Sequence, residues 1–360
     1  MSVRISRIAL VVVSLAVSVF APLKLAAQGA PPDPPSPAAE IVMPSQIVAG
    51  EPATLAVLDA TGHLSAHADV TLSSGAQIQT NALGRVQFAA PAMPGTLFAR
   101  LTSNSSVVAV SIVLEHAVPV AKRIDWAPEF ISIPDRFEIL GVGFHGDAGG
   151  NDVKFRQDPV FVLASSPVSL VLLLKADSTP GAGELVAGDN FIGAPTILIA
   201  MAVELDVDGQ GLVAGAKSNL RLRVRGTEQG QDLQVENLAP AVLKFAHGKV
   251  ALARTSGGED NSAHIEVEAI RGGDFSFHVR ILQNDGSSAD NLAARQFLVA
   301  ARQLASPSLA HRLDPIVSKL EHPDRDAQPV LKQIDKLAQE TNNEQIHVLF
   351  TAARNALMGR

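Results

Sequence analysis

The 360-residue sequence contains no cysteine, no tyrosine and a single tryptophan, Trp126. The lack of cysteine excludes disulfide bonds, thiolate metal ligands, cysteine nucleophiles and lipid-modified cysteine anchors. Sugar-binding modules usually stack Trp or Tyr rings against the sugar, so a sugar-stacking surface is not expected here. Without cross-links, the fold must be stabilised by packing alone, which favours domains larger than disulfide miniatures.

Positive charge is also scarce. Lysine and arginine number 29 against 36 aspartate and glutamate residues, which gives a net charge of −7 without any basic block. Nucleic-acid binding requires clustered lysine and arginine, so we expect no nucleic-acid partner. A hydrophobic fraction of 47% is enough to build buried cores, and the length allows about two to four domains.

Residues 1–29 have the pattern of a secretory signal peptide. Arg4 and Arg7 precede an uncharged, mostly apolar run at residues 8–20, and small residues follow at 26–29. The run is shorter than the roughly 20 residues that a membrane-spanning helix needs. We expect cleavage, the alternative being an uncleaved N-terminal anchor. The mature protein is then exported, periplasmic, at the cell surface or extracellular, with no transmembrane anchor.

Residues 30–39 contain five prolines and predict an extended linker. In residues 40–118, apolar and polar residues alternate in short segments separated by turns, which predicts an antiparallel sandwich. A V-x-D-x-x-G turn at 57–62, A-x-V-x-L at 68–72 and T-N-x-x-G-x-V-x-F at 80–88 follow in order. This series resembles the bacterial immunoglobulin-like modules of surface proteins. Carboxypeptidase-regulatory-like sandwiches carry a similar pattern.

Residues 128–200 contain a strand that runs into a G-x-G-F motif at 141–144. An Asn-Asp-Val-Lys-Phe segment follows at 151–155, and then a buried strand that ends near 174. The ordered set resembles an IPT/TIG domain, although Pro134-Asp135 replaces the usual Pro-x-x-x-Gly lead-in. The resemblance implies an immunoglobulin-like sandwich in which Phe144 closes one end.

In residues 201–286, apolar and polar residues alternate again, which predicts a third sandwich. This segment has no resemblance to a known family. From 288 to 360 the apolar residues recur at helical spacing, with breaks at 306–307, 322–323 and 341–343. These four short amphipathic segments predict a small bundle. The expected fold class is therefore mainly β: tandem immunoglobulin-like β-sandwiches with a C-terminal α-helical segment.

Motifs for catalysis and metal binding are missing from the sequence. It has no nucleophile elbow, no P-loop and no helix-spaced zinc ligands. His63 and His67 flank a turn, and the acidic segment at 206–211 has only two of the acids that a calcium loop needs. Exposed loop histidines and a glycine-rich turn are the favoured interpretations. We expect no enzyme activity, no cofactor and no metal.

One row of residues is a candidate binding site. Arg221, Arg223 and Arg225 alternate with apolar residues between 219 and 225, so a strand would project them together at intervals of about 6–7 Å. Such a row could bind an anionic glycan or an acidic partner. The alternative interpretation is the solvent face of a half-buried strand, because alternation alone produces this pattern.

The predicted function is a secreted or envelope-associated bacterial modular protein. It would act as a non-catalytic, adhesion-like binding or structural component through protein–protein contact or self-association, using loops and exposed sheet edges. Two alternatives stay open. The first is an accessory module of an extracellular enzyme. The second is a periplasmic assembly factor that docks a client through the helical C-terminus.

Overall fold

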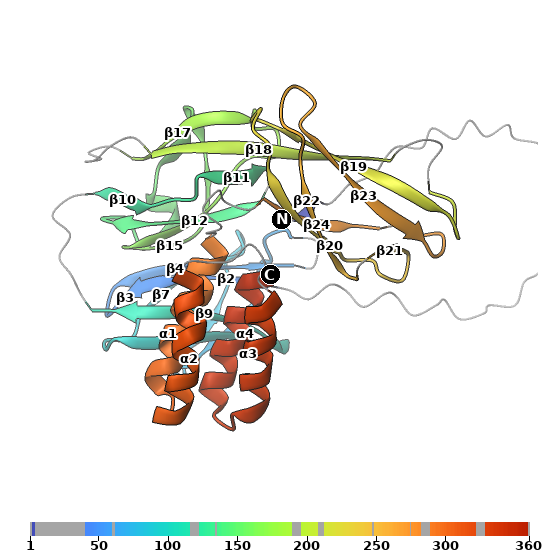
Figure 1. Ribbon diagram of the computed structural model, residues 1–360. Helices are drawn as coiled ribbons and strands as arrows, with labels where there is room; N and C mark the ends of the chain where they lie inside the picture. Colours follow the sequence, from blue (N-terminus) through green and yellow to red (C-terminus); the bar gives the residue numbers. More distant parts are fainter. Residues whose placement is uncertain are drawn as a thin grey trace, which may run out of the picture.

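The computed structural model confirms the predicted fold class: three β-sandwiches are followed by four helices (Figure 1). Apart from Ser2–Val3, the predicted signal peptide lies outside the described residues, as does the linker at 30–39. The structure describes residues 2–3, 40–59, 62–115, 122–133, 135–188, 196–207, 212–246, 248–273, 275–281, 289–321 and 328–358.

The N-terminal sandwich packs two sheets around a core that includes Leu55, Val57 and Leu97. In one sheet, β4 pairs with β2 and β7; in the other, the order is β3-β9-β8-β5-β6. The strands are β2 (Glu40–Val42), β3 (Gln46–Val48), β4 (Pro52–Leu58), β5 (Asp69–Leu72), β6 (Gln77–Gln79), β7 (Arg85–Ala89), β8 (Gly95–Leu101) and β9 (Asn104–Leu114).

The middle sandwich has Ile139, Leu170 and Leu198 in its core. One sheet contains β10 (Arg123–Trp126), β12 (Arg136–Val142), β15 (Phe161–Ser166) and β16 (Ser169–Leu173). The other contains β11 (Phe130–Ile133), β13 (Val153–Phe155), β14 (Asp158–Pro159), β17 (Gly181–Ala187) and β18 (Thr196–Val207). Phe144 of the G-x-G-F motif is buried in this core. At Gly141 a Cβ would lie 2.1 Å from the carbonyl oxygen of Arg123, so only glycine fits there.

The third sandwich continues the sheet of β18 with β19 (Lys217–Arg225), β23 (Ser262–Ala269) and β21 (Leu243–Phe245). The facing sheet has the order β1 (Ser2–Val3), β24 (Phe277–Ile281), β20 (Asp232–Asn237) and β22 (Val250–Arg254). Phe245 and Phe277 stack between the sheets with ring centroids 5.4 Å apart. Each sheet therefore buries one face, as the alternation in the sequence predicts.

Four helices form the C-terminal bundle: α1 (Ala289–Leu304), α2 (Pro307–Glu321), α3 (Gln328–Glu340) and α4 (Glu344–Met358). Proline at the first position of α2 costs no hydrogen bond, because that N–H has no partner within a helix. Asn343 caps α4 by accepting the backbone N–H of Gln345 at 3.0 Å. The predicted breaks at 306–307 and 341–343 are therefore confirmed. Within the described residues, no helix has the length and apolar character needed to cross a membrane.

The bundle packs on the N-terminal sandwich and not on its neighbour in sequence. Phe98 of β8 and Val110 of β9 belong to the same buried cluster as the inner faces of the helices. Arg100 adds an ion pair to Glu344 of α4 at 2.7 Å. Figure 1 shows the helices alongside β9, whereas the third sandwich extends away from them. The strand β9 thus buries apolar residues on both of its faces.

Neighbouring sandwiches are joined through their sheets at two places. At the first joint, between the N-terminal and middle sandwiches, Thr54 of β4 pairs with Ser165 of β15, which links both into one seven-stranded sheet. At the second joint, β18 pairs with β17 over its first half and with β19 over its second half. This strand therefore runs through the boundary predicted between residues 200 and 201, and the division into domains stays a prediction.

Candidate functional site

The three candidate arginines lie on the outer face of β19, as the alternation predicts. The intervening apolar side chains are at most 2% exposed in the core of the third sandwich: Leu220, Leu222 and Val224. The exposed fractions of the arginine side chains rise along the strand, from 34% for Arg221 to 55% for Arg225. The sheet thus places the guanidinium groups of this row on one solvent-facing surface.

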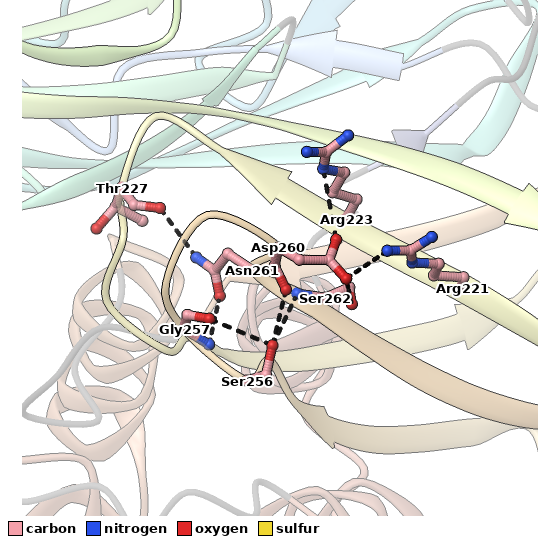
Figure 2. A network of polar contacts seen from close by, with 8 residues as sticks. All are labelled: Arg221, Arg223, Thr227, Ser256, Gly257, Asp260, Asn261 and Ser262. Carbon is pink, nitrogen blue, oxygen red and sulfur yellow. Dashed lines mark hydrogen bonds and ion pairs between the residues drawn. The ribbon is translucent and has the colours of Figure 1, made fainter.

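Each arginine of the row has a carboxylate partner. Arg221 donates a hydrogen bond to Asp260, and Arg223 reaches the other oxygen of the same carboxylate at 3.8 Å (Figure 2). Arg225 pairs with Glu204 of β18 at 2.7 Å. The row therefore lies among acids, and an acidic ligand would have to compete with them for the guanidinium groups.

Asp260 is positioned by a network of hydrogen bonds between two loops (Figure 2). The buried Asn261 donates to the carbonyl of Thr227 at 3.0 Å, and its own amide oxygen accepts the N–H of Gly257 at 3.0 Å. Ser256 donates its hydroxyl to the carbonyl of Asp260 at 2.8 Å. These bonds connect the turn after β19 to the turn before β23, so the carboxylate is held beside the arginines.

The electrostatics of the face follow from this pairing. The hydrogen bond from Arg221 lowers the pKa of Asp260, and the charges of Arg221 and Arg223 add to the effect. Across the strands, Arg223 faces Glu204 and Arg221 faces Asp206. At the far end of β19, the ammonium of Lys217 lies 2.8 Å from Glu266 of β23. The surface is therefore a mosaic of opposite charges, not a basic patch.

Sequence reasoning missed these partners. The segment around Asp260 has the composition of an ordinary solvated loop, and nothing in it indicates which strand it faces. Glu204 becomes a neighbour of the row only through the β18–β19 register. The alternation of β18 around residue 204 is a signal for an outward-facing acid, but the pairing of strands cannot be read from one sequence.

No metal centre appears among the described residues. Within them, no group of three or more His, Asp or Glu side chains is arranged to hold an ion. His63 and His67 are both exposed in the turn that follows β4. Of the acidic segment weighed as a calcium loop, only Asp206 and Val207 are described, and residues 208–211 lie outside the described parts.

A second polar cluster fills the first joint. Oε1 of Glu138 on β12 accepts the backbone N–H of Ser45 at 2.7 Å and the hydroxyl of Ser169. Burial raises the pKa of Glu138, and these hydrogen bonds offset the effect only in part. Nearby, Arg136 pairs with Glu40 of the N-terminal sandwich through both guanidinium nitrogens. This cluster was not predicted, because its serines and acids are dispersed along the sequence.

The end of the bundle carries a hollow of about 360 Å³ between the α1–α2 and α3–α4 turns. Arg312 and Glu340 lie in its wall and form an ion pair at 2.5 Å, which lowers the pKa of Glu340. The remaining lining residues are mostly small and polar, with apolar contributions from Leu304, Leu309 and Ile346.

Comparisons with known proteins identify no family. No family model matches the chain, and no curated protein is similar to it. The IPT/TIG and bacterial immunoglobulin-like resemblances therefore remain predictions, whereas the mainly β architecture of packed sheets with four C-terminal helices is shown by the structure.

Similar solved structures are distant. One is a Bacteroides ovatus mixed-linkage glucan utilization locus protein, SGBP-B, with a bound heptasaccharide: 10% identity, 71% of this chain and 70% of that chain, TM-score 0.23. A second is the Escherichia coli adhesin FdeC: 14% identity, 71% and 94% coverage, TM-score 0.21. A third is the eight N-terminal domains of the cell adhesion molecule DSCAM: 13% identity, 68% and 40% coverage, TM-score 0.21. At these TM-scores the likenesses carry no argument about fold or function.

Proposed function

We propose that this protein is an exported, non-catalytic binding or structural component of the bacterial envelope or exterior, and that it presents a protein-binding surface on a stiff support. The observation that carries the proposal is the way in which the sandwiches are joined. The middle sandwich shares a sheet with the N-terminal sandwich and shares strand β18 with the third sandwich. While both joints are closed, such a body keeps its surfaces at fixed separations, which suits an adhesion-like or spacing role.

The polar face of β19 is the proposed contact surface for a protein partner. Its alternating charges suit a partner with a complementary mosaic, which would exchange ion pairs with Arg221, Arg223 and Arg225. Charge mosaics fix the orientation of a partner and its rate of binding more than they add affinity. The proposed complex should therefore weaken as salt is added.

The test is retention of envelope proteins by the chain lacking residues 1–29. We expect the unsubstituted chain to retain a specific protein, or a second copy of itself, after cross-linking. The variant R221A/R223A/R225A should no longer retain it. The matched control is K319A/K332A/K336A, which removes the same number of exposed cations from the bundle and should retain the partner. Strictly monomeric behaviour without any retained protein would contradict the proposal.

The hollow at the end of the bundle supports one competing function, an assembly factor that docks a client there. Its lining contains both charged and apolar groups, which suits a short peptide segment. If this function is correct, L309R should abolish retention of the client, whereas R221A/R223A/R225A should retain it. Loss of retention in the triple variant alone favours the β19 face.

A further inference from the structure

The first joint differs from an ordinary interface between sandwiches because a carboxylic acid lies inside it. Glu138 is on β12 of the middle sandwich, and Ser45 is in the β2–β3 turn of the N-terminal sandwich. The 2.7 Å hydrogen bond from the Ser45 N–H to Oε1 therefore crosses the joint. The hydroxyl of Ser169, on β16, donates to the same oxygen.

Among the residues that the structure describes, no cation forms an ion pair with this carboxyl group. The charged residues nearest along its own strand and on β2 are Arg136 and Glu40, and they pair with each other. On β10, Arg123 and Asp125 likewise form an ion pair at 2.5 Å. Directly opposite Glu138 on β16 is the apolar Val171. Within the described part of the chain, the carboxyl group thus has hydrogen-bond donors but no ion-pair partner.

The remainder of the joint is built from small polar groups and apolar contacts. Ser166 donates to the carbonyl of Gln46 at 2.6 Å, and Thr54 donates to the carbonyl of Gly146 at 2.7 Å. A small apolar cluster lies beside these bonds and includes Leu58 and Leu163. No strand runs from one sandwich into the other here. The joint consists of the β4–β15 pairing, the small apolar cluster and these hydrogen bonds, and the two main cores lie on either side of it.

The turn that contacts Glu138 also contacts the strand under the bundle. The carbonyl of Ser45 accepts the N–H of Ile112 at 2.9 Å, and that of Pro44 accepts the hydroxyl of Ser111 at 2.6 Å. Ile112 packs against the helices on the other side of β9. Movement at Glu138 would therefore be transmitted to the N-terminal sandwich and bundle together.

We propose that Glu138 is a proton-operated latch, which holds the N-terminal sandwich on the middle sandwich while its carboxyl group is neutral and loosens the joint when it ionises. Glu138 is partly buried in the closed joint and has no ion pair among the described residues, so ionisation leaves a partly desolvated carboxylate, which opening exposes fully to water. Closing takes up one proton and opening releases it, so the proton balance is complete.

The direction of the pH effect follows from the burial of the group. Burial raises the pKa of Glu138 above the ordinary value of 4.5. Its contribution to the closed joint is therefore fully present below that ordinary value and is lost as the pH rises through the raised one. Over that window the opening constant should increase by up to about tenfold per pH unit, the limit for release of one proton.

The test uses the absence of cysteine from the chain. Spin labels on S74C and D177C, exposed sites in the N-terminal and middle sandwiches, report the distance across the joint. We expect a narrow distance distribution in acid that broadens as the pH rises. E138Q, which keeps an acceptor oxygen and cannot ionise, should stay narrow throughout. E184Q, at an exposed position of the middle sandwich, should behave as the unsubstituted chain does.

A second variant keeps the proposal testable if E138Q fails to fold. S169A removes a donor that stabilises the ionised form, so broadening should begin at a higher pH than in the unsubstituted chain. The proposal is overturned if E138Q broadens with pH as the unsubstituted chain does, if S169A leaves the transition unmoved, or if the unsubstituted distribution is independent of pH.

Discussion

The two joints between sandwiches are built in different ways. At the second joint the chain itself is the connection, because β18 pairs with β17 over one half and with β19 over the other. At the first joint the connection is made by one pairing between different strands, at Thr54 and Ser165, and by hydrogen bonds around Glu138, Thr54 and Gly146. Opening the second joint requires breaking a central strand, whereas the first can open and leave both cores folded. Stiffness and adjustability are thus placed at opposite ends of the middle sandwich.

The largest losses of stability are expected from substitutions in the two cores that meet on β18. Leu198 points into the core of the middle sandwich and Met201 into that of the third, and both are fully buried. L198A and M201A should each lower the free energy of unfolding by about 2–5 kcal/mol, through lost contacts and a residual cavity. The measurement is chemical denaturation, with I197A as control because Ile197 is 55% exposed.

The same two variants sharpen the comparison through hydrogen exchange. Because both sandwiches share β18, either substitution should increase exchange in β17 and β19 together. Increased exchange confined to one sandwich in both variants would mean that the second joint is not a single cooperative unit.

A smaller loss is expected from crowding the first joint. A Cβ at Gly146 would lie 1.9 Å from the carbonyl oxygen of Pro52, across the joint. G146A should therefore lower the free energy of unfolding by about 1–3 kcal/mol, and should increase exchange at the first joint but not in β18. G149A is the control, since its nearest neighbours lie at 3.7 Å or more. Equal stability of the two variants would show that the joint is not closely packed.

The smallest effect is expected from the ion pair between the bundle and the N-terminal sandwich. The ion pair between Arg100 and Glu344 is solvent-exposed, with side-chain exposures of 41% and 77%. E344Q should lower stability by less than about 1 kcal/mol and even less in high salt. The apolar contacts of Val110 should dominate instead, so V110D should release the bundle and raise exchange in α1 and α4. A larger loss in E344Q than in V110D would reverse this ranking.

The sequence predicts these regions unequally well. Strands with one solvent-exposed face, such as β19 with its arginine row, are recognised from the sequence. Successive side chains of a pleated strand point to opposite faces, so apolar and polar residues alternate. The helices are recognised by period and by Pro307 and Asn343 at their starts. By contrast, residues 198–201 of β18 are all apolar and show no alternation, because Leu198 and Ala200 enter the core of the middle sandwich and Met201 enters that of the third. Without alternation, the sequence does not show that a single strand continues through this run, and the predicted domain boundary between residues 200 and 201 therefore falls inside the strand.

Contacts between distant segments are the part that a single sequence does not contain. Glu138 and Ser45 are 93 residues apart, and Arg100 and Glu344 are 244 apart. For the interface that contains Arg100 and Glu344, the sequence holds one usable signal. Apolar residues at Val107 to Val110 lie on both faces of β9, which indicates a strand covered on both sides. No comparable signal marks Glu138, because an acid on a strand normally indicates the solvent face.

The central claim is that the three sandwiches form one stiff body while the first joint is closed, and the distance between its two ends tests it most directly. Spin labels on S74C in the N-terminal sandwich and E259C in the third sandwich occupy exposed sites and span both joints. In mildly acidic buffer the account predicts a single narrow distance distribution. A broad distribution at that pH, typical of modules that move independently, would contradict it.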